Sequence, residues 1–117
     1  MVSLALSLVL VAMGRLQVSP CDSARTTLEM QKCLSHEIKS SEERLKRVED
    51  SLVAKLSPRQ VVVFRRASAA WMLFRDLECE SEAERFSGGT MAAVVELECR
   101  LALTDRRRKD VRIASRP

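Results

Sequence analysis

The sequence predicts an all-α fold, a small antiparallel three-helix bundle held together by two disulfides. Three observations lead to this prediction. The chain of 117 residues contains only three glycines, three prolines and no tyrosine, whereas sheets use turn formers and aromatic residues freely. Apolar residues recur at helical spacing along segments that are separated by turn signals. The four cysteines, an even number in a short chain, are typical of a secreted, disulfide-bonded domain.

The N-terminal residues 1–14 resemble a signal peptide. An apolar run from Ser3 to Met13 contains no charge, although no Lys or Arg precedes it as is usual. The run is too short to cross a bilayer core of about 30 Å as a helix, but it suits the hydrophobic region of a signal peptide. Ala12 and Gly14 supply small residues for cleavage. We therefore expect a periplasmic or secreted protein without a transmembrane span, and an uncleaved N-terminal anchor is the alternative.

The remaining chain divides into a lead at residues 15–25, a helical domain at residues 26–113 and a tail at residues 114–117. The first helix is expected from about Thr26 to Leu56. Thr26 or Thr27 can cap it, and Glu29, three residues after Thr26, completes a capping box. Its apolar stripe follows steps of three and four residues and consists of Leu34, Ile38, Ser41, Leu45, Val48 and Leu52.

The second helix is expected from about Pro58 to Glu84. Ser57 can cap it, and proline is favoured at the first helical position. One side of this helix carries Val61, Phe64, Ser68, Trp71 and Phe74.

The third helix is expected from about Met91 to Ile113, after a turn at Ser87-Gly88-Gly89 and a capping Thr90. It contributes Met91, Val94, Val95, Cys99, Ala102 and Leu103 to the core. Short connections between the three helices imply antiparallel neighbours.

The cysteine spacing favours local disulfides among the three pairings that four cysteines allow. Residues 79 and 99 are symmetric about Gly89, so on a hairpin of the second and third helices they would face each other at one height. A disulfide needs Cα atoms roughly 4.4–6.8 Å apart, which close packing there would supply. Residues 21 and 33 are symmetric about the start of the first helix. We therefore expect Cys21–Cys33 and Cys79–Cys99.

The stretch AWMLFRDLEC is predicted to be part of the core. Trp71 and Phe74 lie one turn apart and are expected to pack against the first helix. Arg75 follows Trp71 by four residues, so it can cover the indole as a cation–π partner or pair with Glu78 or Glu82. A structural role is favoured over anion binding for this arginine.

No catalytic or metal-binding motif is present. The sequence lacks G-x-S-x-G, a phosphate loop and H-E-x-x-H. Asp76 is expected to pair with basic residues of its own or the third helix, and an enzyme hypothesis would depend on Asp76 or Glu78. The only histidine, His36, and the absence of a CxxC pair argue against a metal site. We expect no enzyme, no metal and no cofactor.

A basic run, with Arg112 beyond it, ends the third helix: Arg106, Arg107, Arg108 and Lys109. Its simplest interpretation is a solvated helix end, where positive charge also interacts favourably with the helix dipole. The alternative is a surface that binds a polyanion or an acidic partner. The net charge of +4 is modest and mixed with acids, so nucleic acid is not an expected partner.

Three stretches together resemble the lysozyme inhibitor LprI-like family, which consists of small exported bacterial helical domains. They are CDSARTTLEMQKCL, RRASAAWMLFRDLECESEA and GGTMAAVVELECRLALTDRR. The second is the most specific, with Trp71, Arg75-Asp76 and Cys79 at the family spacing. Two departures are Phe74, where the family commonly has tyrosine, and Ser40-Ser41, where an Ala-Asp pair is usual.

The resemblance implies an exported, non-enzymatic protein-binding domain whose partner is lysozyme. The alternative is an envelope module that binds another protein or a polyanion through its basic C-terminal helix. Animal lysozymes are typically cationic, so a net charge of +4 would oppose long-range attraction. An arginine inserted into the acidic cleft of lysozyme would still provide local complementarity. The oligomeric state is not predicted.

Overall fold

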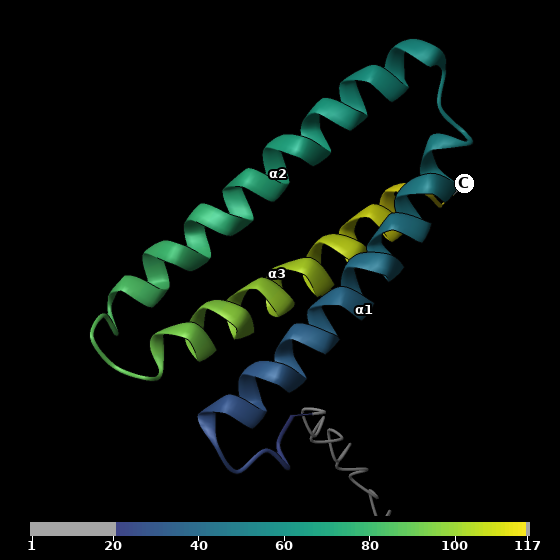
Figure 1. The fold of residues 1–117 in the computed structure, drawn as a ribbon. Helices are drawn as coiled ribbons and strands as arrows, with labels where there is room; N and C mark the ends of the chain where they lie inside the picture. The colour runs from purple at the N-terminus through teal and green to yellow at the C-terminus, as the bar shows by residue number, and fades with distance from the viewer. Residues whose placement is uncertain (1–20, 117) are drawn as a thin grey trace, which may run out of the picture.

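The computed structural model describes residues 21–116 and contains three helices, α1 (Thr27–Val53), α2 (Pro58–Glu84) and α3 (Ala92–Ala114). The chain runs up, down and up again, so α2 is antiparallel to α1 and α3 (Figure 1). α3 packs against both other helices, whereas α1 and α2 have few backbone approaches to each other. α2 diverges from α3 toward its own N-terminus (Figure 1). The predicted all-α bundle is confirmed.

The expected signal peptide and most of the lead lie outside the described residues. Within residues 21–116, no helix is long and apolar enough to span a membrane.

The first two helices begin as their capping residues predict. Thr26 Oγ1 accepts a hydrogen bond from the Glu29 amide at 3.1 Å, and the Glu29 carboxylate accepts from the Thr26 amide at 3.3 Å. Ser57 caps α2 in the same reciprocal way with Gln60, and Pro58 occupies the first turn. Each pair satisfies amide groups that the helix itself leaves unpaired.

The connection between α2 and α3 depends on Gly88, whose φ of 85° is strained for residues with a side chain. α3 then begins without a side-chain cap, because its N-cap is Met91 and no side chain accepts from the first turn. The predicted capping role of Thr90 is therefore wrong. The turn is instead closed by backbone hydrogen bonds, including Gly89 N to Phe86 O at 3.1 Å.

The apolar core lies between α1 and the first half of α3. Its buried centre is Cys21, Leu34 and Val94, with partly buried residues around it: Met30, Cys33, Leu97 and Leu101. Further along α1 the predicted stripe is confirmed, since Ile38, Ser41 and Leu45 are also buried. The Cys21–Cys33 disulfide holds the start of the described segment, residues 21–25, against this core.

The inward face of α2 differs from the prediction. The stripe from Val61 to Trp71 continues through three buried residues, Arg75, Cys79 and Ala83. Phe74 is instead 55% exposed, so the expectation that it packs in the core with Trp71 is wrong. The next buried position after Trp71 comes four residues later, at Arg75, rather than three residues later, at Phe74. Phe74 therefore faces solvent and Arg75 faces the other helices.

The inward face of α3 also differs in part. Val94, Thr104 and Val111 are its buried residues, whereas Met91 is 44% exposed and Ala102 faces solvent. The apolar pattern misses Thr104 because a polar residue occupies an inward position.

Both expected disulfides are present. The Cα atoms are 5.7 Å apart in Cys21–Cys33 and 5.4 Å apart in Cys79–Cys99. Cys79 is fully buried. The second disulfide holds the diverging α2 to α3 at the end where the two helices are joined, and the first holds Cys21, which precedes α1, to that helix.

Replacing both Cys79 and Cys99 with alanine is expected to lower the free energy of unfolding by about 3 kcal/mol, because the unfolded chain regains the entropy of an open loop. The sequence separations of 20 and 12 residues are similar on the logarithmic scale that governs loop entropy. The matched variant without Cys21 and Cys33 should therefore lose a comparable amount. Urea unfolding of both variants and the oxidised wild type measures this. A loss below about 1 kcal/mol for Cys79–Cys99 would contradict the expectation.

Candidate functional site

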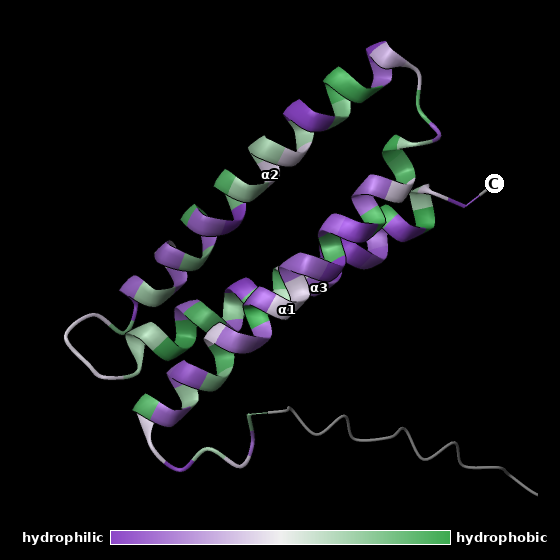
Figure 2. Cartoon of the chain, turned by 45° about the vertical axis from the view of Figure 1, so that its right-hand side comes forward, coloured by the Kyte–Doolittle hydropathy of each residue, from purple (hydrophilic) through white to green (hydrophobic). Residues whose placement is uncertain are grey.

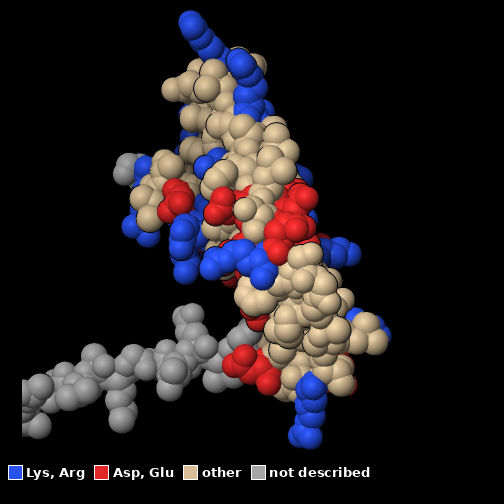
Figure 3. Space-filling view, turned by 90° about the vertical axis from the view of Figure 1, so that its left-hand side faces the viewer, with Lys and Arg blue, Asp and Glu red and all other residues tan. Residues whose placement is uncertain are grey.

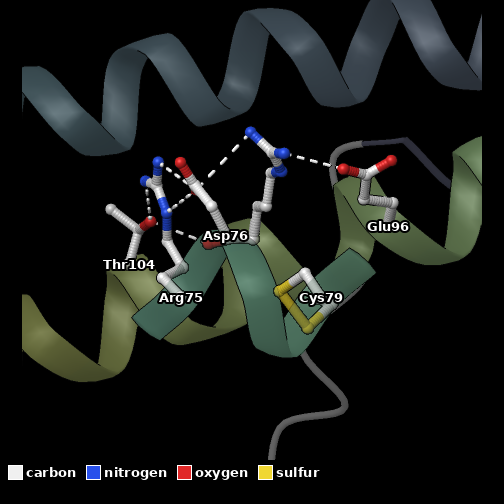
Figure 4. Close-up of a disulfide and its surroundings, with 7 residues drawn as sticks. Arg75, Asp76, Cys79, Glu96 and Thr104 are labelled. Carbon is white, nitrogen blue, oxygen red and sulfur yellow. Dashed lines mark hydrogen bonds and ion pairs between the residues drawn. A yellow bond between two sulfur atoms is a disulfide. The ribbon is translucent and has the colours of Figure 1, made fainter. Parts of the chain in front are cut away.

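A buried arginine on α2 joins all three helices. The Arg75 side chain is only 3% exposed. Its Nη1 donates to Glu42 of α1 at 2.8 Å and to Thr104 of α3 at 3.0 Å. Its Nε donates to the neighbouring Asp76 at 3.0 Å, and Nη2 lies 2.9 Å from the same carboxylate oxygen (Figure 4). A guanidinium carries five N–H donors, which lets one side chain serve three partners.

The indole of Trp71 lies beside two guanidinium groups. The Cζ atoms of Arg75 and Arg107 are 5.6 Å and 5.7 Å from the ring centroid. Both distances are within the range of a cation–π contact. The predicted cation–π role of Arg75 is confirmed, whereas the predicted pairing with Glu78 or Glu82 is wrong, since its ion pairs are with Glu42 and Asp76.

Asp76 extends the network toward the start of α3. It lies 3.5 Å from Arg100, which pairs with Glu96 at 2.7 Å (Figure 4). The expected pairing of Asp76 with its own helix and with the third helix is thus present. The Asp76 carboxylate sits between two arginines, an arrangement that holds α2 against α3 beside the Cys79–Cys99 disulfide.

The basic run at the end of α3 does not form one surface. Arg107 turns toward Trp71 of α2. Arg108 and Arg112 turn toward α1, and Arg106 and Lys109 are exposed and make no ion pair within residues 21–116. The candidate partner-binding residues of the sequence are therefore divided among three directions.

A groove between α1 and α3 collects four arginines. Its volume is about 320 Å³. We call it the arginine groove, and its lining residues are Arg44, Arg47, Val48, Ser51, Arg108 and Arg112. No carboxylate lines it. Two of the guanidinium groups have side-chain partners, Arg44 with Ser40 at 3.1 Å and Arg108 with Asp105 at 3.7 Å.

The outward side of α2 carries large apolar residues in its C-terminal half. Leu73, Phe74 and Leu77 are 62%, 55% and 56% exposed. We call these three residues the α2 face. Arg75 and Cys79 lie on the opposite side of the same helix turns. Their hydrogen bonds and disulfide to the other helices hold the backbone of these turns in place. Figure 2 shows hydrophobic residues along α2, which stands apart from the other two helices.

A third feature is a mostly apolar groove of about 590 Å³ at the end where α2 diverges. Its residues come from all three helices: Leu52, Leu56, Arg59, Gln60, Val63, Phe64, Ala67 and Ala114. The last turns of α1 and α3 are joined nearby by a hydrogen bond from Lys55 Nζ to Ser115 O at 2.7 Å.

One carboxyl group on α1 has a shifted pKa. A hydrogen bond from Lys46 at 2.6 Å holds the pKa of Asp50 below its ordinary value of 3.8, and burial opposes this only in part. The pair lies on the surface and contributes little to stability. Within residues 21–116 no three His, Cys, Asp or Glu side chains are grouped so that they could hold a metal ion.

A family model for the lysozyme inhibitor LprI matches residues 20–111, which is most of the chain. The chain belongs to the LprI lysozyme inhibitor family. No curated protein and no solved structure matches it.

Sequence reasoning missed two features of this LprI family member. Hydrophobic spacing predicts Phe74 in the core, whereas the buried residue at this turn is Arg75. The α1 half of the arginine groove was also missed, because Arg44 and Arg47 lie some sixty residues before Arg108. A signal for the groove does exist, since both arginines of α1 are spaced three residues apart and so share a helix face.

Replacing Arg75 with methionine is expected to lower the free energy of unfolding by about 3 kcal/mol, because Glu42, Asp76 and Thr104 lose their shared partner. The two carboxylates are each 41% exposed, which keeps the loss at the lower end for a buried ion pair. The control is Arg66→Met on the same helix, an exposed arginine that should change stability by less than about 0.5 kcal/mol. Urea unfolding of both variants distinguishes them, and equal losses would contradict the network's role.

Proposed function

We propose that this protein acts outside the cytoplasm, without catalytic activity, by binding and inhibiting lysozyme. The family match supports this function. The two disulfides support the location, since disulfides persist in oxidising compartments such as the periplasm.

The α2 face is the surface that we assign to the lysozyme contact, and its exposure is the observation that supports the proposal most. Apolar residues that lie together on a surface are typical of protein-binding sites. Leu73, Phe74 and Leu77 lie on neighbouring turns of one helix. Because Arg75 and Cys79 fix these turns from behind, the face is already ordered and loses little conformational entropy on binding.

Acidic residues follow the α2 face along the helix. Glu80 and Glu84 continue the row of Leu73 and Leu77, and Glu78 follows Phe74 by one turn. All three glutamates are exposed and form no ion pair within residues 21–116. On one face of the molecule, Figure 3 shows acidic side chains beside uncharged surface, with basic side chains next to them.

The glutamates beside the α2 face favour a cationic partner locally, although the net charge of the chain is positive. The whole chain carries +4 and would repel a cationic lysozyme at long range. Near contact, charges beyond a Debye length of about 8 Å are screened at physiological salt, so the local glutamates dominate. An apolar centre with an acidic margin is complementary to a cationic partner.

Replacing Phe74 with alanine is expected to weaken inhibition of lysozyme by about tenfold or more, since a central aromatic residue commonly contributes about 2 kcal/mol to an interface. The measurement is the rate of bacterial cell-wall lysis at increasing concentrations of oxidised protein. The control is Ile113→Ala, which removes a side chain of similar exposure, 60%, near the end of α3. Neither change removes a buried side chain, so both variants should fold.

Two results would count against the proposal in different ways. Equal effects of the two substitutions would show that the α2 face is not the contact surface. Unchanged lysis with a large molar excess of the wild-type protein, against lysozymes of several types, would remove lysozyme as the partner.

A further inference from the structure

The arginine groove concentrates positive charge that carboxylates within residues 21–116 neutralise only in part. Arg44 and Arg47 of α1 face Arg108 and Arg112 of α3 across about 320 Å³. In the described part of the chain, Arg108 alone of these four forms an ion pair, with Asp105 at 3.7 Å, and Asp105 also accepts a hydrogen bond from Ser41 at 2.6 Å. Like charges that are brought together in this way repel one another, and an anion between them would remove the repulsion.

The groove also holds an unpaired donor. The Nε atom of Arg108 is buried and has no hydrogen-bond partner in the described part of the chain, and the side chain as a whole is only 18% exposed. Arg47 and Arg112 make no side-chain hydrogen bond or ion pair within residues 21–116, so their guanidinium donors are available. Val48 contributes an apolar wall between the arginines.

The number and type of donors point to phosphate chemistry. A guanidinium presents a planar set of donors that matches the oxygens of phosphate or carboxylate. A single carboxylate has one charge and two oxygens, which is too little for four guanidinium groups. A phosphate monoester or diphosphate offers more charge and more acceptor oxygens. The groove volume is at the lower end of small-molecule sites, which run from about 300 to 1,000 Å³.

We infer that the arginine groove is a binding site for a phosphate-bearing ligand of about diphosphate size. This site is separate from the α2 face, because it lies between α1 and α3 in their C-terminal halves, and it does not depend on lysozyme binding. It also differs from a general affinity of the basic run for polyanions. Three residues of that run, Arg106, Arg107 and Lys109, lie outside the groove, and two of the groove's four arginines come from α1.

The test compares two double variants that remove the same charge. Arg47→Gln with Arg112→Gln removes from the groove two guanidinium groups that have no side-chain partner within residues 21–116. Arg106→Gln with Lys109→Gln removes two exposed positive charges from outside the groove. Inorganic pyrophosphate is the probe, with citrate as the carboxylate comparison, and binding is measured by calorimetry in about 0.15 M salt to screen general attraction.

We expect pyrophosphate to bind the wild type more tightly than citrate does, and to raise its melting temperature. The groove variant should lose about tenfold or more in affinity, as expected for charged hydrogen bonds, and the control should stay within about twofold of wild type. Equal losses in both variants, tighter binding of citrate, or no binding to the wild type would each overturn the inference.

Vesicles distinguish the two sources of such a phosphate group. Phosphatidic acid vesicles that bind the wild type and not the groove variant, while phosphatidylcholine vesicles bind neither, identify a lipid headgroup as the ligand. Binding of free pyrophosphate without groove-dependent vesicle binding identifies a soluble phosphate compound. Both results support the phosphate site.

Discussion

The contact of Arg75 with all three helices is the interaction on which the remaining structure depends. The backbones of α1 and α2 come close to each other at few places, so long polar side chains connect the two helices. The ion pair of Arg75 with Glu42, at 2.8 Å, is the most buried of these connections. On α2 the only other buried residues are Cys79 and Ala83. A helix with so little apolar burial would gain little from packing alone. A guanidinium with three partners and one disulfide therefore hold α2 in place.

This way of attaching α2 explains why its surface is unusual. Arg75 and Cys79 occupy the side of α2 that faces the other helices. The large apolar residues of the same stretch therefore lie on the opposite, solvent-exposed side. Leu73, Phe74 and Leu77 are exposed for that reason, and the network behind them keeps them in fixed positions. The structural role of the AWMLFRDLEC stretch and the binding role proposed for it thus lie on two sides of one helix. Loss of Arg75 would loosen the helix turn that carries Phe74, so stability and the proposed contact are coupled.

The parts of this structure that sequence could predict are those with local signals. The capping residues of α1 and α2, the helical spacing and the symmetry of the cysteines about two turns each act within about twenty residues, and they predict the helices and disulfides correctly. The orientation of α2 could not be predicted in this way, because hydrophobicity ranks Phe74 above Arg75 for burial. Burial of Arg75 is favourable only because Glu42 and Thr104, from the other two helices, accept hydrogen bonds from its guanidinium. The arginine groove is equally non-local, since its two halves come together only when α1 and α3 pack in parallel.

Although the net charge is +4, the surface carries one acidic and one basic region. Because the two regions are separate, they could bind partners of opposite charge. Glutamates that form no ion pair within residues 21–116 lie in the C-terminal half of α2, near the α2–α3 turn. The arginine groove lies between α1 and α3 in their C-terminal halves, toward the end where Lys55 contacts the end of α3. Charges more than about 8 Å apart are largely screened at physiological salt, which limits the influence of one region on the other. A cationic protein on the α2 face and an anion in the groove could therefore be bound by one molecule without competing, which a uniformly basic surface would not allow.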